Sequence, residues 1–148
     1  MQHAISFSYS DKKWLDIAFD IRQKVFVEEQ QVDAREEYDE FEQSSIHYLV
    51  FAGEKPVGTA RWRITKEGIK LERFAVLKDS RNMKAGRTVL LKVLEDVIPL
   101  HKKIYMNAQV TAMNFYIREG FIAEGEMFIE CNIKHYKMVW HPTPIRTS

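Results

Sequence analysis

A strand-like run leads directly into a short basic loop, and this junction carries residues suited to binding an anion. Residues 71–76 read Leu-Glu-Arg-Phe-Ala-Val, and the polar loop that follows contains Arg81, Lys84, Gly86 and Arg87 before an apolar-periodic helix begins. A helix that follows such a loop presents unpaired backbone N–H groups and the positive end of its dipole to an anion. The sequence therefore predicts a site for a phosphate-bearing ligand.

A second motif follows the first along the chain. Residues 104–121 read Ile-Tyr-Met-Asn-Ala-Gln-Val-Thr-Ala-Met-Asn-Phe-Tyr-Ile-Arg-Glu-Gly-Phe. This pattern predicts a strand that ends in a polar residue, then a short helix with Gly120 at its C-terminal cap. The alternative is that this segment has no ligand-binding role and only packs in the core.

Together, the two motifs resemble the acetyl-CoA-binding motifs of the Gcn5-related N-acetyltransferase (GNAT) superfamily. The loop of that superfamily usually reads Gln/Arg-x-x-Gly-x-Gly/Ala; Arg81 and Gly86 match it, and Lys84 stands where the first glycine usually sits. Lysine keeps the amide cradle without strain if its φ stays negative. The resemblance implies an α/β (α+β) GNAT fold, in which helices flank a mixed, mostly antiparallel sheet. A V-shaped acetyl-CoA cleft then opens between two parallel strands.

The resemblance also implies which residues contact acetyl-CoA, and it implies no metal. The cofactor-binding residues are expected to be Phe74, Ala75, Val76, Arg81, Asn82, Met83, Lys84, Ala85, Gly86, Arg87, Thr88, Gln109, Asn114 and Tyr116. Tyr116 matches the tyrosine that lies near the thioester sulfur and protonates the leaving CoA. The alternative is that Tyr116 is only an aromatic residue at the edge of the core.

Two residues are candidates for the general base that deprotonates the acceptor amine. His135 lies in a late His-x-x-Met pattern that resembles the glyphosate N-acetyltransferase subgroup, where the histidine is the base, and imidazoles titrate near neutral pH. Glu72 matches a central-strand position where some members of the superfamily place a catalytic glutamate. The alternatives are a histidine bonded to backbone and a carboxylate paired with Lys70 or an arginine. We expect His135 as the base and keep Glu72 as the second candidate.

The acceptor is expected to be a small-molecule amine that attacks the acetyl group directly in a ternary complex. Arg22 and Arg73 match arginines that hold an acidic substrate in the same subgroup, which implies an anionic amine. Both arginines could instead pair with the acidic run at residues 28–42, and an acidic rim would attract a polyamine or a protein lysine. A protein acetyltransferase and a non-catalytic CoA-binding sensor therefore remain as alternatives. Glu29, Asp39 and His47 are further candidates for the acceptor side.

Composition fits one small enzyme domain. The chain has 148 residues, 45% of them hydrophobic, which suits a single domain at 1–141 and a short tail at 142–148. The net charge of +1 argues against nucleic acid as a partner. No apolar run approaches a membrane span and no signal pattern opens the chain, so we expect a cytoplasmic protein without membrane contact. Cys131 is the single cysteine and is expected to be unreactive.

Hydrophobic periodicity predicts the order strand, helix, loop, three strands, helix, strand, helix, strands. Strands are expected at 5–9, 46–52, 57–65, 69–76 and 104–109, with one bent or two strands within 126–140, and helices at 12–27, 90–98 and 112–119. The acidic run predicts a loop or weak helix over the surface. The strand–helix–strand step across residues 71–109 indicates a parallel pair. The last strands, with Phe128, Ile129 and Trp140, offer an edge for a homodimer.

Overall fold

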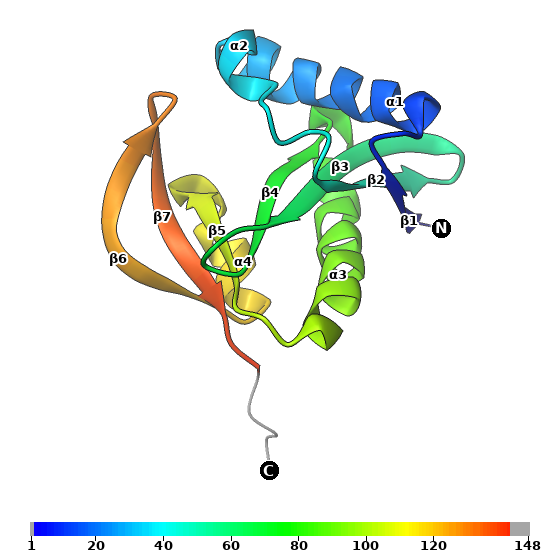
Figure 1. Cartoon of the computed structure of the whole chain (residues 1–148). Coiled ribbons are helices and arrows are strands. Elements are labelled where there is room, and N and C mark those ends of the chain that lie inside the picture. The colour runs from blue at the N-terminus through cyan, green and yellow to red at the C-terminus, as the bar shows by residue number, and fades with distance from the viewer. Residues whose placement is uncertain (1, 143–148) are drawn as a thin grey trace.

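A seven-stranded sheet forms the centre of the computed structural model, which describes residues 2–142 except for the side chains of Asn82 and Met83 (Figure 1). The strands are β1 (Gln2–Ser8), β2 (Ile46–Ala52), β3 (Lys55–Ile64), β4 (Ile69–Val76), β5 (Ile104–Gln109), β6 (Phe121–Glu130) and β7 (Ile133–Trp140). They lie in the order β1-β2-β3-β4-β5-β7-β6, with β4 and β5 parallel and the other neighbours antiparallel. The predicted mixed sheet is confirmed. The expected tail, 142–148, lies outside the described residues except for Pro142.

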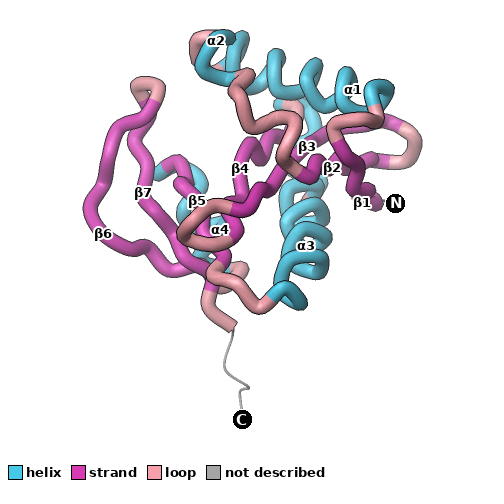
Figure 2. Tube along the Cα trace, viewed as in Figure 1, coloured by secondary structure: helices cyan, strands magenta, loops and turns pink. Residues whose placement is uncertain are grey.

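Helices cover both faces of the sheet (Figure 2). They are α1 (Lys12–Arg22), the π-helix η1 (Gln23–Glu29), α2 (Ala34–Glu37), the 3-10 helix η2 (Lys78–Met83), α3 (Ala85–Val97), and the short η3 (Ile98–Leu100), η4 (Val110–Ala112) and α4 (Met113–Arg118). The single helix expected at 12–27 therefore changes to π geometry after Arg22, and Gln30 N–H donates to the carbonyl of Val25 (3.0 Å). None of the described helices is long and apolar enough to cross a membrane.

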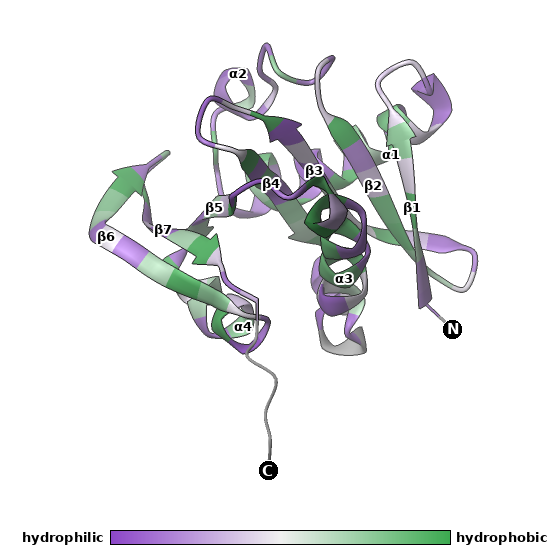
Figure 3. Cartoon of the chain, turned by 60° about the horizontal axis from the view of Figure 1, so that its bottom comes forward, coloured by the Kyte–Doolittle hydropathy of each residue, from purple (hydrophilic) through white to green (hydrophobic). Residues whose placement is uncertain are grey.

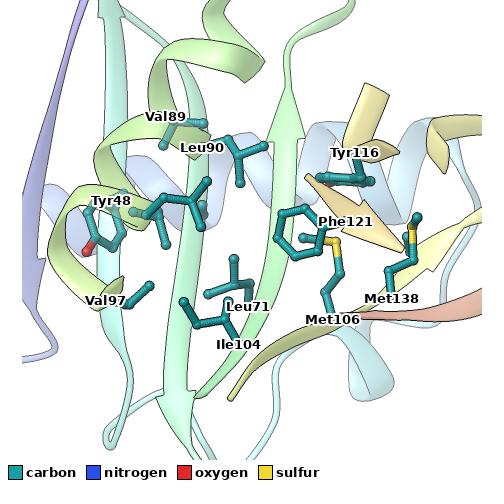
Figure 4. Close-up of a cluster of buried hydrophobic side chains, with 14 of the residues drawn as sticks. Tyr48, Leu71, Val89, Leu90, Val97, Ile104, Met106, Tyr116, Phe121 and Met138 are labelled. Atoms are coloured by element: carbon teal, nitrogen blue, oxygen red, sulfur yellow. The ribbon is translucent and has the colours of Figure 1, made fainter. Parts of the chain in front are cut away.

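Alternation along β2 separates two hydrophobic cores. Tyr48 and Val50 pack with α3 and α4 on one face, whereas Leu49 and Phe51 pack with α1 and η1 on the other. Successive strand side chains point to opposite faces, so a strand covered on both sides reads as a continuous apolar run. Figure 4 shows the larger core, in which Tyr116 lies beside Phe121. Burial of each such side chain contributes about 1.5–3 kcal/mol.

The acidic run forms loops and the four-residue helix α2, as expected, and most of its carboxylates are exposed. Glu37, Asp39 and Glu42 turn inward, and Glu37 and Glu42 are buried. Arg22 binds Glu37 (2.7 Å) and Glu42 (2.6 Å), and Arg61 binds Asp39 (2.8 Å) and Glu42 (2.8 Å). The alternative that Arg22 pairs with the acidic run is confirmed, and carboxylates can be buried in this way when arginine charges compensate them.

The parallel strands β4 and β5 separate after a short region of pairing. Their ladder joins Ile69–Leu71 to Ile104–Met106, and the strands are unpaired beyond it. Two residues of β4, Arg73 and Phe74, oppose the single residue Ala60 of β3, and Arg73 has a φ of +58°. This is a β-bulge, which bends its strand and turns it away from a neighbour. The bulge explains why the edge of β4 that faces β5 is open.

The hairpin β6–β7 curves away from the rest of the sheet, and along β6 a hydrophilic stretch at 124–126 separates two hydrophobic stretches at 121–123 and 127–129 (Figure 3). Its loop consists of Cys131 and Asn132, with φ of +52° and +63°, as a type I′ turn requires. At this tip, the thiol of Cys131 donates a hydrogen bond to Glu36 of α2 (3.0 Å). The region within 126–140 is therefore two strands, and their tip reaches across to the helical layer.

Candidate active site

Two adjoining clefts meet where β4 and β5 part. The strand cleft, about 880 Å³, lies between β4, β5, the η1–α2 segment and the hairpin β6–β7. The loop cleft, about 800 Å³, lies between the end of β4, the η2–α3 junction and α4. Both clefts are lined by the end of β4 at residues 74–76 and by Arg81, Thr111, Ala112 and Tyr116. A ligand could therefore extend from one cleft into the other.

The loop cleft has the properties expected of an anion site. The 13-residue helix α3 begins at Ala85 without a side-chain cap, so its first backbone N–H groups are available to a ligand. Lys84, Gly86 and Arg87 line the cleft at this helix end. Arg81 also lines it, and its guanidinium binds the carboxylate of Glu29 through two contacts of 2.5 Å. Arg81 is therefore ion-paired, and an anionic ligand at this position would take the place of the Glu29 carboxylate.

Lys84 differs from the expectation of a negative φ. Its φ is +62° and ψ +17°, in the left-handed region, and it precedes the first residue of α3. A side chain with Cβ is strained there by roughly 1–2 kcal/mol. The chain thus keeps the backbone that a glycine would favour and adds a lysine charge to the cleft.

We expect Lys84→Gly to raise the free energy of unfolding by about 0.5–1 kcal/mol, since it removes this strain at some cost in chain entropy. Urea denaturation measures the change. Lys102→Gly, at an exposed position outside the described helices and strands, is the control and should not stabilise. If Lys84→Gly lowered the free energy of unfolding instead, contacts of the lysine side chain would stabilise the fold by more than its backbone strain costs.

Tyr116 lies where the two clefts meet. Its ring packs edge-on against Phe74, Phe115 and Phe121, with centroids 6.1, 5.1 and 5.8 Å away. The side chain lines both clefts, and within the described part of the chain no hydrogen bond holds its hydroxyl. Burial raises the pKa of Tyr116. The phenol therefore keeps its proton at neutral pH and can give it to a ligand.

His135 lines the strand cleft and is 6% exposed. Its Nδ1 lies 2.7 Å from the carbonyl of Ile133, and its ring stacks on Phe128 (5.6 Å). A carbonyl oxygen only accepts, so Nδ1 carries the hydrogen and Nε2 of the neutral ring keeps its lone pair. Directly opposite on β5 is Gln109, which also lines this cleft. His135 is thus fixed in the tautomer that a base requires.

Glu72 lines the same cleft but is held by cations. It binds Arg61 (3.0 Å), Arg63 (2.8 Å) and Lys70 (3.3 Å). Burial opposes its ionisation, but Arg61 and Arg63 outweigh burial and lower the pKa of Glu72. A carboxylate with a lowered pKa is a weak base at neutral pH. The geometry disagrees with Glu72 as the general base and matches the alternative of an ion-paired strand residue.

The two arginines expected to hold a substrate are also engaged. Arg22 is 1% exposed, lies outside both clefts, and directs Nε, Nη1 and Nη2 to Glu37 and Glu42. The expectation that Arg22 binds a substrate is therefore corrected: its role is structural. Arg73 lines the strand cleft, where it binds Glu37 (3.2 Å) and Asp39 (3.2 Å).

The other residues expected at the cofactor divide into two groups. Phe74, Ala75, Val76, Arg81, Lys84, Gly86 and Arg87 line the loop cleft. The side chain of Ala85 is buried, and Asn114 is exposed and lines neither cleft. The hydroxyl of Thr88 is hydrogen-bonded to Gln2 and to the carbonyl of Lys84. Gln109 donates a hydrogen bond to Gln30 across the strand cleft (2.9 Å). Of these four residues, Gln109 lines the strand cleft, and the side chains of the other three line neither cleft. The side chains of Asn82 and Met83 lie outside the described ones.

Several residues of this region were missed from the sequence. Phe115, Arg118 and Glu119 of the α4 segment line the loop cleft, and Glu119 binds Arg87 (2.8 Å). The pattern after β5 could have indicated them, since residues three apart lie on one helix face. His47, considered for the acceptor side, is buried and bonds the carbonyl of Glu42 (2.8 Å), away from both clefts.

Comparison with known proteins agrees with this architecture. Residues 8–142 match the model of the acetyltransferase (GNAT) domain family. The uncharacterized N-acetyltransferase YjcF of Bacillus subtilis (strain 168) is 39% identical over 87% of this chain and 94% of its own length. The uncharacterized protein YyaT of the same organism is 34% identical over 82% of this chain and 84% of its own length. The crystal structure of Escherichia coli ElaA superposes with a TM-score of 0.85 at 25% identity, covering 95% of this chain and all of that one.

These comparisons do not support the glyphosate N-acetyltransferase subgroup that Arg22, Arg73 and His135 suggested. They do support the family as a whole: its model spans nearly the entire described chain, and the relatives align along most of their length. The two motifs at residues 71–91 and 104–121 lie on the two clefts described above. The chain belongs to the GNAT family of N-acetyltransferases.

Proposed function

We propose that the enzyme transfers an acetyl group from acetyl-CoA to the amine of a small molecule by direct attack, with His135 as base and Tyr116 as acid. The observation that carries this proposal is the position of the Tyr116 hydroxyl, which lies where the two clefts join and has no hydrogen-bond partner among residues 2–142. Contact between Cys131 and Glu36 narrows the mouth of the strand cleft. This favours a small acceptor over a protein lysine.

The residues of the loop cleft fit acetyl-CoA. The uncapped start of α3 and the basic side chains Arg81, Lys84 and Arg87 suit the pyrophosphate. A Cβ built on Gly86 would meet protein atoms only at 3.7 Å or more, so the protein itself does not require glycine there. The open edge of β4 offers backbone groups to the extended pantetheine arm, as a sheet edge does to an added strand.

When bound, acetyl-CoA supplies an activated acetyl thioester, whose C–S bond breaks as a C–N bond forms to the amine. Nε2 of His135 takes the proton that the attacking nitrogen loses. Tyr116 gives its proton to the departing sulfur, which leaves as a thiol. Cys131 does not act as a nucleophile in this scheme, because burial and the neighbouring Glu36 raise the pKa of its thiol to about 11.

A thermal-shift titration with acetyl-CoA tests the cofactor. A ligand that binds only the folded state stabilises it by about 2.7 kcal/mol at a hundredfold excess over its Kd. We expect a saturable rise in Tm, and we expect Gly86→Ala to weaken binding by roughly tenfold, about 1.4 kcal/mol, while the unliganded protein keeps or gains stability. Adenosine diphosphate is the ligand control. If Gly86→Ala bound acetyl-CoA with wild-type affinity, the proposal that this loop binds the pyrophosphate would be wrong.

The pH–rate profile distinguishes the two candidate bases. A general base acts only in its unprotonated form, so the rate of the wild type should fall on the acid side of the profile. In His135→Gln we expect kcat to fall by about 100-fold and the acidic limb to disappear. Glu72→Gln should keep that limb, because the lowered pKa of Glu72 leaves it ionised throughout the range. A limb that survives in His135→Gln and vanishes in Glu72→Gln would reverse the assignment.

A further inference from the structure

The cations around the strand cleft are already paired with carboxylates of the protein. Arg22, Arg61, Arg63, Lys70 and Arg73 form one network with Glu37, Asp39, Glu42 and Glu72, through contacts of 2.6–3.3 Å. Arg35 binds Asp33, and Arg81 binds Glu29. An anionic acceptor would have to compete with these partners for every arginine that lines the cleft.

Two carboxylates at the mouth of the cleft have no such partner. Glu36 on α2 and Glu130 on β6 line the strand cleft, are exposed, and form no ion pair within the described residues. Five cationic and five anionic side chains line the cleft, and Glu36 and Glu130 are the two of these carboxylates that form no ion pair within the described residues. Glu36 accepts a hydrogen bond from the thiol of Cys131, but neither carboxylate is held by an ion pair where a substrate would enter.

The same face of the hairpin also carries the buried base. Phe128 pairs with His135 across β6 and β7, and Glu130 is two residues farther along β6, so its side chain shares their face. The distance between such positions is about 7 Å along the strand. His135 is more than nine-tenths buried, its Nε2 has no hydrogen-bond partner in the described chain, and it lines the cleft that Glu130 borders.

We propose that the acceptor is a diamine or polyamine, whose reacting nitrogen lies at His135 while a second, protonated nitrogen binds Glu36 and Glu130. This inference rests on the proposed function and names the substrate class of the same site. It replaces the anionic amine that Arg22 and Arg73 had suggested, because those arginines are committed to the network. A cation reaching the mouth would pair with Glu36 in place of the Cys131 thiol and with Glu130, without breaking any ion pair of the network.

Three amines of equal chain length test the charge requirement. Putrescine carries a second amine, γ-aminobutyrate carries a carboxylate in its place, and n-butylamine carries neither. We expect kcat/KM for putrescine to exceed that for γ-aminobutyrate by at least about tenfold, and the preference to shrink at high salt. Calorimetry of putrescine binding to the CoA complex provides a readout besides turnover. Equal or better use of γ-aminobutyrate would overturn the inference.

Substitution of the two glutamates tests the location. In Glu36→Gln/Glu130→Gln we expect the ratio of putrescine to γ-aminobutyrate to fall to about one, because the ion pairs at the mouth are lost. Glu126→Gln, an exposed carboxylate on the same strand that does not line the cleft, should keep the wild-type ratio. An unchanged ratio in the double variant would place the selectivity elsewhere.

The acetyl-CoA thermal shift separates the two levels of the argument. If acetyl-CoA stabilises the protein and putrescine neither binds nor reacts, the substrate class is wrong and the acetyltransferase proposal stands. If acetyl-CoA gives no shift and none of the three amines is acetylated, the proposed function itself fails. Both glutamate variants should retain the wild-type shift with acetyl-CoA, since Glu36 and Glu130 lie outside the loop cleft.

Discussion

Arg61→Met is expected to lower the free energy of unfolding by about 4 kcal/mol. Arg61 is fully buried in β3 and binds Asp39 (2.8 Å), Glu42 (2.8 Å) and Glu72 (3.0 Å). Methionine fills similar volume, so the loss comes from three carboxylates left without their shared cation. Most domains have only 5–15 kcal/mol of stability, so the variant should be close to unfolding at physiological temperature.

Urea and thermal denaturation measure this effect, and Arg35→Met provides the matched control. Arg35 also forms an ion pair, with Asp33 at 3.0 Å, but its side chain is 91% exposed, so its replacement should leave the unfolding midpoint unchanged. Similar midpoints for the two variants would show that the buried network contributes little to stability.

The network also predicts sensitivity to acid. Burial opposes the ionisation of Asp39, but Arg61 outweighs it and lowers the pKa of Asp39 to about 2. A group whose pKa is lower in the folded state stabilises the fold above its unfolded pKa, near 4, and this contribution disappears as the pH falls toward 2. Asp39→Asn should therefore be less stable than wild type at neutral pH and lose less stability between pH 4 and 2.

Tyr116→Phe is expected to lower kcat by about 100-fold while acetyl-CoA affinity changes little. The hydroxyl has no hydrogen bond to any described residue, and the ring packing against Phe74, Phe115 and Phe121 is kept in the variant. Folding stability should not fall, because phenylalanine needs no partner for a buried hydroxyl. Loss of activity would then report proton transfer alone.

Steady-state kinetics with acetyl-CoA binding measured in parallel tests this role. Tyr105→Phe is the control: Tyr105 is buried, lines neither cleft, and shares a hydrogen bond with Thr65 (2.6 Å). It should lose some stability and keep kcat. If Tyr116→Phe retained wild-type kcat at all pH values, another group or water would have to protonate the leaving thiolate.

Local patterns predicted the fold well because its central strands are continuous apolar or alternating runs. The bounds of β2, β4 and β5 agree with those expected from periodicity, and the parallel β4–β5 pair follows from the helix that joins them. The start of α3 was less well placed, since Lys84 takes a left-handed conformation that no local pattern of lysine indicates.

The charged residues were harder to predict because their partners are distant in sequence. Arg22 and Glu42, or Arg61 and Glu72, come together only when α1, β3 and β4 have packed, and composition alone made the acidic run look solvated. His135 and Tyr116 were found from motifs, but the tautomer of one and the unpartnered hydroxyl of the other required coordinates. Glu36 and Glu130 carry no sequence signal, since each is one glutamate among many.

The two clefts are built from different parts of the chain. The loop cleft comes from β4, the η2–α3 junction and α4, which succeed one another in the middle of the sequence, whereas the mouth of the strand cleft comes from α2 and the β6–β7 tip. Mutations in those two outlying segments can alter acceptor specificity without changing how the acetyl donor is bound. This division gives the scaffold evolvability: acceptor specificity can diverge between descendants that share one unchanged donor site.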